Sequence, residues 1–554
     1  MVKDQAMAEE ILKMMDTALE CSESLMDFLN KKRYQVFLRV SLDLVDLIGA
    51  IRNVSKTLKK EENNLNILEA SESVYCSLQR IREYADQNPL KAKHKIEYEL
   101  IPLIEEMRMM FYFWGICYPN PEKVKKYYSE DIHFYSRNQY VEEAEKMGNY
   151  KYDLSILVMA YNKLPYTKLC LESLMNNLPV GISYELILLN HGSTDGTKEY
   201  FEYLNPNKQF DIAVNGGGSG ASLRILEGKY HLFISNDVLV TPNAINNLYD
   251  CINSDESIAW VVPSTPNVSN LQTIYLAYSD LTELNKAAEK NNVFDYRRHE
   301  QRFRLCNPID IRRGKAAWEL QFSGYLHANE RFAFPDDKIS LLCRRNGYKM
   351  YLAKDAYCHH FGSVTMQEEI KTVDNLYSHG RISFYESFGI DPWENGFCYD
   401  ALLFDALPCC NKGHVEILSV NCGLGSNPLK IKEKIKEVSG NTDVYLHNYT
   451  SHIRLISDLL GISDCAELFT QWESFIFPSP EKRYDYIIIE EFPENEMYAD
   501  KVLNTFIRRL SEPGKMIINA SKEYVLDQKN RYKNIDILDC REGRRWAIFS
   551  SHLE

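Results

Sequence analysis

Apolar residues recur at alternating spacings of three and four along the first 148 residues, which is the period of an amphipathic helix. The clearest stretch consists of Phe37, Val40, Leu44, Leu47, Ile51, Val54 and Leu58. A second stretch runs from Leu65 to Ile81 and a third from Ile96 to Trp114. We therefore expect residues 1–148 to form an antiparallel helical bundle. The alternative is a docking surface for an acceptor or for a second copy of the chain.

At Lys151 the period changes to short apolar runs separated by helical stretches, the pattern of a mostly parallel sheet. These runs are Leu154–Val158, Glu185–Leu189 and His231–Ser235, followed further along the chain by Val415–Val420 and Tyr484–Ile489. The segment from Ala401 to Gly413 is typical of a linker. The pattern predicts an α/β protein with a helical domain at 1–148, a first α/β domain at 149–400 and a second at 410–554.

Composition narrows the class of protein. The chain has 554 residues and a formal net charge of −14, which argues against a general nucleic-acid-binding protein. No run reaches the roughly 18 apolar residues of a membrane span, and the N-terminus lacks the apolar core of a signal peptide. The 14 cysteines are scattered without a C-x-x-C pair, as in proteins with reduced thiols. We expect a cytoplasmic protein.

Small polar residues follow the first two predicted strands of the middle region. The first strand ends in Ala160-Tyr161-Asn162, and the second in Asn190-His191-Gly192-Ser193-Thr194-Asp195. Ligands of parallel sheets bind at the carboxyl ends of the strands. A glycine-rich run, Asn215 to Ser222, comes next; alone it is more often a flexible loop than a phosphate cradle, but its place before a predicted helix favours the second interpretation.

The third strand ends in Ser235-Asn236-Asp237, whose oxygen atoms suit a hard divalent cation that bridges a diphosphate. The alternative is that Asp237 caps the helix predicted near Pro242.

Two further groups carry candidate chemistry. Asp336 and Asp337 precede an amphipathic stretch; they are either helix N-caps or a general base whose pKa its neighbour raises. His359 and His360 stand before a Gly-Ser loop, where they are candidate metal ligands, although a single histidine is more often structural.

Taken together, the segments from about 152 to 385 resemble the family 2 glycosyltransferases, which have the GT-A fold. The resemblance is carried by "SILVMAYNKLPYTKLCLESL", "ELILLNHGSTDGTKEY", "YHLFISNDVLVTPNAI", "ANERFAFPDD" with "CRRNGY", and "YCHHFGSVT". It implies an inverting transfer of a sugar from a nucleotide diphosphate sugar to an acceptor hydroxyl.

The resemblance also implies roles for single residues. The donor would be bound by Ala160, Tyr161, Asn190, Gly192, Ser193, Asp195 and Asn236. Asp237 and His360 would hold Mn²⁺ or Mg²⁺, and Asp336, with Asp337 as its rival, would take the proton of the acceptor hydroxyl.

The chain departs from the family pattern at three places. Asn190 stands where the family has an aspartate, although an amide oxygen still accepts a hydrogen bond from a base. Asp is present only at the last position of the metal motif, and Pro335 occupies the first place of the usual Glu-Asp pair. Between these motifs lie several arginines, among them Arg312 and Arg313, which we interpret as a solvated face, with a contact for diphosphate or for an acidic acceptor as the alternative.

The C-terminal region resembles the Rossmann-like class I methyltransferases through "HVEILSVNCGLGSNPLKIKEK" and "YDYIIIEEFPENEMYADKVLNTFIRRLSEPGKMIIN". Ser419 replaces the usual acid of the first strand, and His447 and Asn448 stand where an acid would bind the cofactor ribose. Binding of S-adenosylmethionine is therefore doubtful, and a structural or acceptor-handling domain is favoured.

These expectations combine into one function. The chain would transfer a sugar, UDP-linked in the favoured case, to a protein Ser/Thr of the flagellin kind or to a precursor of a surface glycan, as in bacterial surface glycosylation. No nucleic acid or membrane span is expected, and the N-terminal helices are a possible contact for a homo-oligomer. One alternative is a bifunctional glycosyltransferase and methyltransferase; another is a non-catalytic scaffold with a decayed transferase core.

Overall fold

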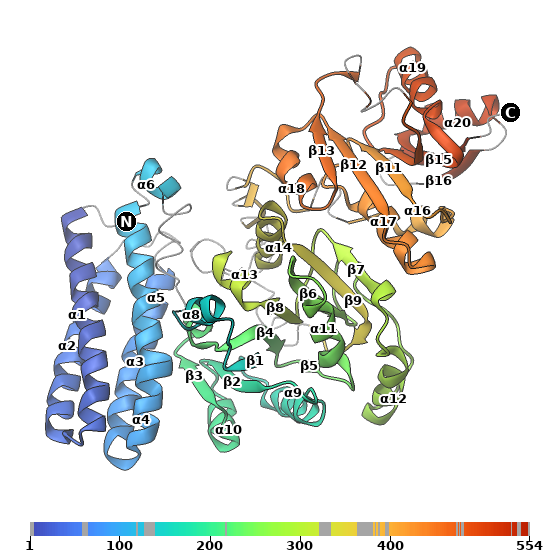
Figure 1. Ribbon diagram of the computed structural model, residues 1–554. Coiled ribbons are helices and arrows are strands. Elements are labelled where there is room, and N and C mark those ends of the chain that lie inside the picture. The colour runs from blue at the N-terminus through green and yellow to red at the C-terminus, as the bar shows by residue number, and fades with distance from the viewer. Residues whose placement is uncertain are drawn as a thin grey trace.

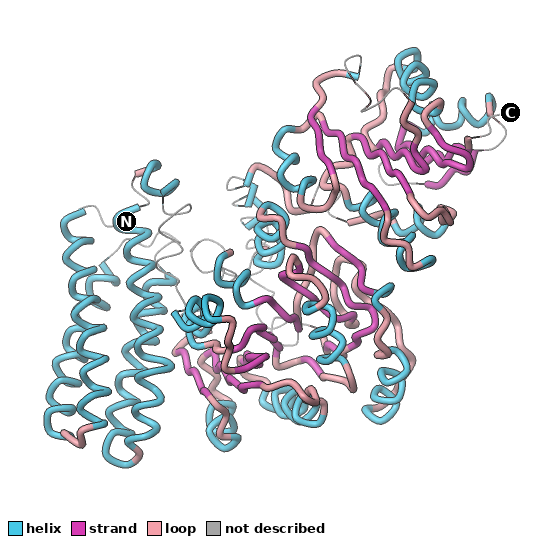
Figure 2. Tube along the Cα trace, viewed as in Figure 1, coloured by secondary structure: helices cyan, strands magenta, loops and turns pink. Residues whose placement is uncertain are grey.

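The structure is a computed structural model of the 554-residue chain. It describes residues 5–57, 65–117, 120–126, 139–215, 219–320, 334–362, 380–382, 384–385, 388–393, 398–472, 475, 477, 481–532, 535–539 and 544–551. Figure 1 shows a sheaf of long helices, a central α/β region and a second α/β region that follow one another along the chain. Figure 2 shows that the strands lie in the last two regions.

The predicted N-terminal helices are present, and they pack side by side around a common apolar core. They are α1 (Gln5–Asn30), α2 (Tyr34–Thr57), α3 (Leu65–Gln87), α4 (Pro89–Lys95) and α5 (Ile101–Tyr112), followed by the short α6 (Pro121–Lys126) and α8 (Gln139–Met147). A π-helical turn, Ile96–Leu100, joins α4 to α5 without a break, and a second, Phe113–Cys117, follows α5. In the part of the chain that the structure describes, no helix is both long enough and apolar enough to cross a membrane.

The central region is built on an eight-stranded sheet with the order β3-β2-β1-β4-β8-β6-β9-β7. The strands are β1 (Tyr152–Ala160), β2 (Tyr184–His191), β3 (Lys208–Ile212), β4 (Gly228–Ser235), β6 (Ile258–Ser264), β7 (His299–Arg302), β8 (Ile309–Arg313) and β9 (Lys349–Tyr357). The helices are α9 (Leu164–Asn176), α10 (Thr197–Leu204), α11 (Ala244–Asn253), α12 (Leu281–Asn291), α13 (Gly314–Glu319) and α14 (Pro335–Arg345). Strands β1 to β4 are parallel, as the alternating pattern predicts, and β8 runs antiparallel to β4 and β6.

The two faces of this sheet bury apolar side chains against different partners. Ile156 and Val158 of β1 point into a core shared with α9 and α11. Leu157 of β1 points the other way, together with Leu189 and Phe233, into the core of the helical bundle. Successive side chains of a strand alternate between faces, so a continuous apolar run is the mark of a sheet covered on both sides. The bundle is therefore one of the layers that cover the sheet.

The C-terminal region contains a seven-stranded sheet with the order β13-β12-β11-β14-β15-β17-β16. The strands are β11 (Val415–Val420), β12 (Val444–Thr450), β13 (Cys465–Leu468), β14 (Tyr484–Ile489), β15 (Leu510–Ser521), β16 (Ile535–Asp539) and β17 (Arg544–Ser550). The helices are α17 (Ser426–Ser439), α18 (Ile456–Leu460), α19 (Glu496–Ile507) and α20 (Lys522–Arg531). The first five strands of this order are parallel and β17 is antiparallel to both neighbours, which is a Rossmann-like sheet.

The segment from Ala401 to Gly413 differs from the predicted linker, because Ala401–Ala406 forms a helix, α16. Leu403 and Phe404 of this helix are buried in the core of the C-terminal sheet. The sequence pattern missed this because a helix of six residues is too short to show a period.

Candidate active site

The loops that follow β1 and β2 are joined to each other by hydrogen bonds. The backbone N–H of Asn162 donates to Oγ of Ser193 at 2.8 Å, and the N–H of Thr194 donates to Oδ1 of Asn162 at 2.9 Å. Ala160 is buried and pairs with Asn190 in the parallel ladder, and Tyr161 is half-buried beside it. The structure thus brings the two predicted nucleotide-binding segments together at one edge of the sheet.

The close approach of the loop after β2 to the segment that follows β3 requires glycine at position 192. Gly192 has φ +74°, and a Cβ atom there would lie 2.6 Å from the carbonyl oxygen of Ala213. Any larger residue would clash with backbone that cannot move aside.

Asn190 is buried, and both ends of its carboxamide are engaged. Its Oδ1 accepts a hydrogen bond from the N–H of Ser193 at 3.0 Å, and its Nδ2 donates to Oδ1 of Asp211 at 3.1 Å. Asp211 lies on β3 and was not predicted as a site residue from the sequence. Strand β3 was not among the predicted strands, because its sequence, Lys-Gln-Phe-Asp-Ile, is not an apolar run.

Asp195 has a supporting position in the nucleotide loop. Its Oδ2 accepts from the N–H of Leu164 at 2.7 Å, and its Oδ1 accepts from the hydroxyl of Thr197 at 2.6 Å. Partial burial acts to raise the pKa of Asp195, but these hydrogen bonds hold the pKa below its usual range. The carboxylate therefore ties the start of α9 to the start of α10. Of the glycine-rich run, Gly216, Gly217 and Gly218 lie outside the described residues.

Asp237 and His360, which are 123 positions apart in the sequence, lie next to each other in the structure. A two-stranded ladder explains this: β5 (Val238–Leu239) pairs antiparallel with β10 (His359–His360). Oδ2 of Asp237 is 3.4 Å from Nε2 of His360, and both side chains are buried. Asp237 does not cap α11, which begins at Ala244 after Asn243.

This pair fits a divalent cation. Two ligands that each lie about 2.1 Å from one ion at a right angle are about 3 Å apart, close to the separation observed here. His359 is turned away, because its Nδ1 lies 2.6 Å from the hydroxyl of Tyr278. Asn236 is occupied in positioning the first loop, since its Nδ2 donates to the carbonyl of Asn162 at 3.0 Å and to Thr167 at 2.9 Å.

The two acids at the start of α14 have different surroundings. Asp337 is buried and accepts two hydrogen bonds from Arg304, at 2.6 and 3.2 Å. Among the described residues, no hydrogen bond or ion pair of the Asp336 carboxylate is found. Burial, and next the charge of Asp337, raise the pKa of Asp336 to about 7. The geometry therefore leaves Asp336 as the acid that can exchange a proton near neutral pH.

A loop that follows β6 connects the acid pair to the histidine. Nδ2 of Asn267 donates to the carbonyl of His360 at 3.0 Å, while the hydroxyl of Ser269 lies 3.0 Å from the thiol of Cys306. Nδ2 of Asn270, in the same loop, donates to the backbone carbonyl of Arg304, the partner of Asp337. Asn267 has φ +57°, a left-handed conformation that costs free energy and is often found at functional sites. The loop therefore contacts both His360 and the arginine that binds Asp337.

Of the arginines between these motifs, Arg297 is exposed, but most of the others do not form the predicted solvated face. Arg304, Arg312 and Arg313 are buried. Nη2 of Arg312 lies 2.8 Å from Oδ2 of Asp310, which is fully buried, and Arg313 donates to backbone carbonyls, among them that of Ile258 at 2.8 Å. Pairing of this kind is how proteins bury guanidinium groups. Charge in the sequence did not distinguish paired buried arginines from exposed ones.

The glycine loop after β11 lacks features expected of a site for S-adenosylmethionine. A Cβ atom at Gly425 would lie 2.7 Å from Ile462, so side chains of the protein already fill the space beside this glycine. Asn421 is engaged with the N–H of Ser451 at 2.8 Å. No acid stands at Ser419 or Asn448, where the cofactor ribose would need an acceptor. The predicted likeness to methyltransferases stays a prediction.

Comparison with known proteins agrees with this geometry. Residues 155–304 match the family described as Glycosyl transferase family 2. Poly(ribitol-phosphate) beta-glucosyltransferase of Bacillus spizizenii is 29% identical over 115 residues, which cover 19% of this chain and 18% of that protein. Minor teichoic acid biosynthesis protein GgaB of Bacillus subtilis is 31% identical over 107 residues, which cover 18% of this chain and 12% of that protein. The chain thus spans less than a fifth of the length of these curated relatives.

Solved structures match the chain weakly. A structure of GalNAc-T7 with UDP, GalNAc and Mn²⁺ is 12% identical, covers 38% of this chain and 44% of its own, and has a TM-score of 0.30. TarS of S. aureus, residues 1–349, is 15% identical, covers 41% of this chain and 65% of its own, and has a TM-score of 0.28. Scores this low carry no weight for the fold. The family match and the strand order confirm the expected family 2 glycosyltransferase domain with a GT-A fold.

Proposed function

We propose that this chain is an inverting glycosyltransferase that moves a sugar from a UDP-linked donor to an acceptor hydroxyl. The observation that carries the proposal is the pairing of Asp237 with His360 at the carboxyl end of β4, on the sheet edge where the two nucleotide loops meet. The family match over residues 155–304 supports the same reaction.

Different residues at this edge of the sheet would bind the base and the diphosphate of the donor. Tyr161 and Asn190 lie on the two joined loops and would contact the base of the nucleotide. Asp237 and His360 would hold Mn²⁺ or Mg²⁺, which when bound would neutralise the charge of the leaving diphosphate. The buried position of both ligands would exclude water from their contact with the donor and strengthen the electrostatic attraction.

Asp336 would take the proton of the acceptor hydroxyl. A general base works best when its pKa lies near the working pH, and burial together with Asp337 raises the pKa of Asp336 to about 7. Asp337, bound by Arg304, would support this role by its charge. Attack by the deprotonated oxygen on the face opposite the leaving diphosphate would invert the anomeric carbon.

For the acceptor, the names of the two Bacillus relatives favour a precursor of a surface glycan over a protein Ser/Thr. A hydroxyl of a polyol-phosphate or related polymer is the acceptor class that we propose. The cytoplasmic location expected from the sequence belongs to the same proposal.

The proposal is tested by nucleotide release from UDP-, GDP- and dTDP-sugars, with and without Mn²⁺. We expect metal-dependent release from the UDP-linked donors and a loss of about 100-fold or more in Asp237→Asn, because the variant lacks the carboxylate that holds the ion. Asp250→Asn, an exposed acid on α11, is the matched control and should keep full activity.

If none of these donors is turned over and calorimetry detects no binding of UDP, the transferase proposal is wrong, and the core is better regarded as a scaffold. Metal-independent release that Asp237→Asn leaves unchanged would remove the metal from the proposal.

A further inference from the structure

A buried ionic cluster joins the helical bundle to the sheet directly behind the nucleotide loop. Lys95 of α4 binds Oε2 of Glu99 at 2.7 Å and Oδ2 of Asp211 on β3 at 2.5 Å. Arg80 of α3 binds Oε1 of Glu99 at 2.7 Å and the backbone carbonyl of Asp211 at 3.0 Å. Glu99 also accepts the backbone N–H of Asp211 at 2.7 Å. Three side chains of the bundle thus surround one residue of the transferase sheet.

The centre of the cluster is buried, its Arg80 edge is partly exposed, and its charges balance. Lys95, Glu99 and Asp211 are each exposed by 1% or less. Its two cations and two carboxylates cancel, and only a paired arrangement makes such burial tolerable. Burial acts to raise the pKa of Asp211, but the charge of Lys95, followed by that of Arg80, holds this pKa well below its usual range. Asp211 is therefore a fixed carboxylate, which accepts hydrogen bonds and donates none.

This fixed carboxylate determines which way the amide of Asn190 points. Because Asp211 can only accept, the amide nitrogen of Asn190 must face it, at 3.1 Å. The amide oxygen then faces the nucleotide loop, where it already accepts the N–H of Ser193 at 3.0 Å and keeps a second lone pair. A reversed amide would set an oxygen against a carboxylate and a nitrogen against an N–H.

We infer that Lys95, Glu99 and Arg80 of the helical bundle are positioning residues that act through Asp211. They present the amide oxygen of Asn190 to the nucleotide base. This arrangement selects a base with a ring N–H, such as uracil. This inference rests on the proposed function, since it names the feature of the donor base that Asn190 would recognise. It also gives the helical bundle a role in donor recognition.

The cluster also accounts for asparagine at position 190, where the family has an aspartate. A carboxylate at 190 would stand about 3 Å from that of Asp211, and two close like charges resist joint ionisation. With Asn190, the one negative charge of this pair lies on β3, where the bundle neutralises it. Moving the charge back to position 190 and placing the amide at 211 would keep the sum of charges in the cluster unchanged.

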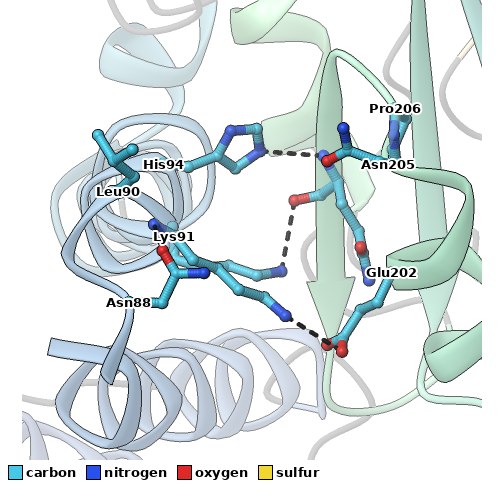
Figure 3. Close-up of a pocket in the computed structure, with 9 residues that line it drawn as sticks. Asn88, Leu90, Lys91, His94, Glu202, Asn205 and Pro206 are labelled. Carbon is cyan, nitrogen blue, oxygen red and sulfur yellow. Dashed lines mark hydrogen bonds and ion pairs between the residues drawn. The ribbon is translucent and has the colours of Figure 1, made fainter. Parts of the chain in front are cut away.

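The same interface offers a matched control. Beside the cluster lies a cavity of about 430 Å³ whose walls include Lys91, His94 and Glu202 (Figure 3). Lys91 binds Glu202 of α10 at 3.1 Å, and both side chains are about a quarter exposed (Figure 3). This ion pair joins the bundle to the central domain and is separate from the ion pair of Asp211 with Lys95. Lys91→Met therefore breaks a lysine–carboxylate contact of this interface and leaves Asn190 as it is.

The experiment measures binding of UDP and CDP to the full chain by calorimetry. The variants are Lys95→Met, Asp211→Asn, Asn190→Asp, the double exchange Asn190→Asp with Asp211→Asn, and the control Lys91→Met. We expect Lys95→Met and Asp211→Asn to weaken UDP binding about tenfold or more, because a buried polar partner is lost. The preference for UDP over CDP should fall as well, because the amide is free to turn and cytosine has no N3–H. Lys91→Met should bind both nucleotides as the parent does.

The double exchange keeps the inference testable if the single variants fail to fold, since it preserves the charge of the cluster. It should bind UDP better than either single exchange. The inference is overturned if folded Lys95→Met and Asp211→Asn bind UDP and CDP in the parent's ratio, or if the folded double exchange binds no better than the single ones. If the parent protein binds neither UDP nor CDP, the proposed UDP donor fails first, and the inference fails with it.

Discussion

At the scale of single residues, the site separates acids of the same kind by giving them different partners. Asp337 pairs with Arg304, and the raised pKa of its neighbour, Asp336, is caused first by burial and second by Asp337. Asp211 pairs with Lys95 and is held ionised. A carboxylate with a cation at hydrogen-bonding distance stays ionised, whereas a buried one without such a partner becomes a weaker acid. The surroundings, rather than the residue type, assign the role of base.

Asp336→Asn should abolish turnover and, above pH 7, stabilise the fold. The folded-state pKa of Asp336 is about 7, above that of an unfolded aspartate, so its stabilising contribution is complete at low pH and is lost as the pH rises through 7. An asparagine does not ionise, so it avoids this loss of stability. We expect the free energy of unfolding of the variant to exceed that of the parent by on the order of 1 kcal/mol at pH 8, and this difference should disappear toward pH 4. In the parent, kcat/KM should rise with pH up to about 7 and then level off.

Urea unfolding at pH 5 and pH 8 and a pH–rate profile check this prediction. As the comparison, Asp337→Asn should destabilise the fold at both pH values, since it leaves the buried Arg304 without its carboxylate. Full activity of Asp336→Asn would show that another group takes the proton.

At the scale of elements, the helix that carries the acid pair is held at its far end by the C-terminal region. Arg344 near the end of α14 donates to Oδ1 of Asp458 on α18 at 3.0 and 2.7 Å, and Arg345 donates to Oδ2 at 3.0 Å. Asp458 is fully buried. Leu341 of α14 packs in the same apolar cluster as Leu459 of α18. The C-terminal region therefore fixes the axis of the helix on which Asp336 stands (Figure 1).

Asp458→Asn should destabilise the protein by about 3–5 kcal/mol, because it leaves a buried guanidinium without a counter-charge. It should also lower kcat more than it weakens UDP binding, since α14 carries the proposed base and the nucleotide loops lie elsewhere. Urea unfolding and steady-state kinetics test both effects. The control, Asp527→Asn, breaks a half-exposed ion pair with Arg531 and should change stability by less than about 0.5 kcal/mol. Equal stability of Asp458→Asn and the parent would contradict this account of α14.

At the scale of the whole molecule, the central domain is covered from two sides by the regions that flank it in sequence. The helical bundle buries the face of the sheet that carries Leu157, Leu189 and Phe233. The C-terminal region packs against α14 and accepts ion pairs from it. A face this apolar would be exposed to water if the bundle were absent, and exposed apolar patches of that kind drive association. The bundle is thus a structural layer of the transferase domain.

Residues 149–554 alone should therefore be insoluble or aggregate, and co-expression of residues 1–148 as a separate chain should restore part of the soluble yield. The physical reason is the loss of cover over Leu157, Leu189 and Phe233, together with the loss of the cations that neutralise Asp211. Soluble yield and light scattering measure the outcome. A monodisperse 149–554 fragment that unfolds at the parent's temperature would refute the layer interpretation.

The sequence by itself determined the elements and the type of chemistry. The spacing of apolar residues predicted the helices of the bundle and the strands β1, β2, β4, β11 and β14, because the period of a pattern is local to a helix or strand. The order of short motifs predicted the family 2 domain, which the match over residues 155–304 confirms.

Only the tertiary structure decided which residues act together. It placed the Asp237 carboxylate beside the His360 ring, paired Asp337 with Arg304, buried most of the arginines that charge alone had suggested were solvated, and joined Asp211 to Lys95. Each of these results depends on burial and on a partner far away in the chain; Lys95 and Asp211, for example, are 116 residues apart. The local pattern of a sequence carries the period of an element, but the partner of a charge is set by the packing of whole elements against one another.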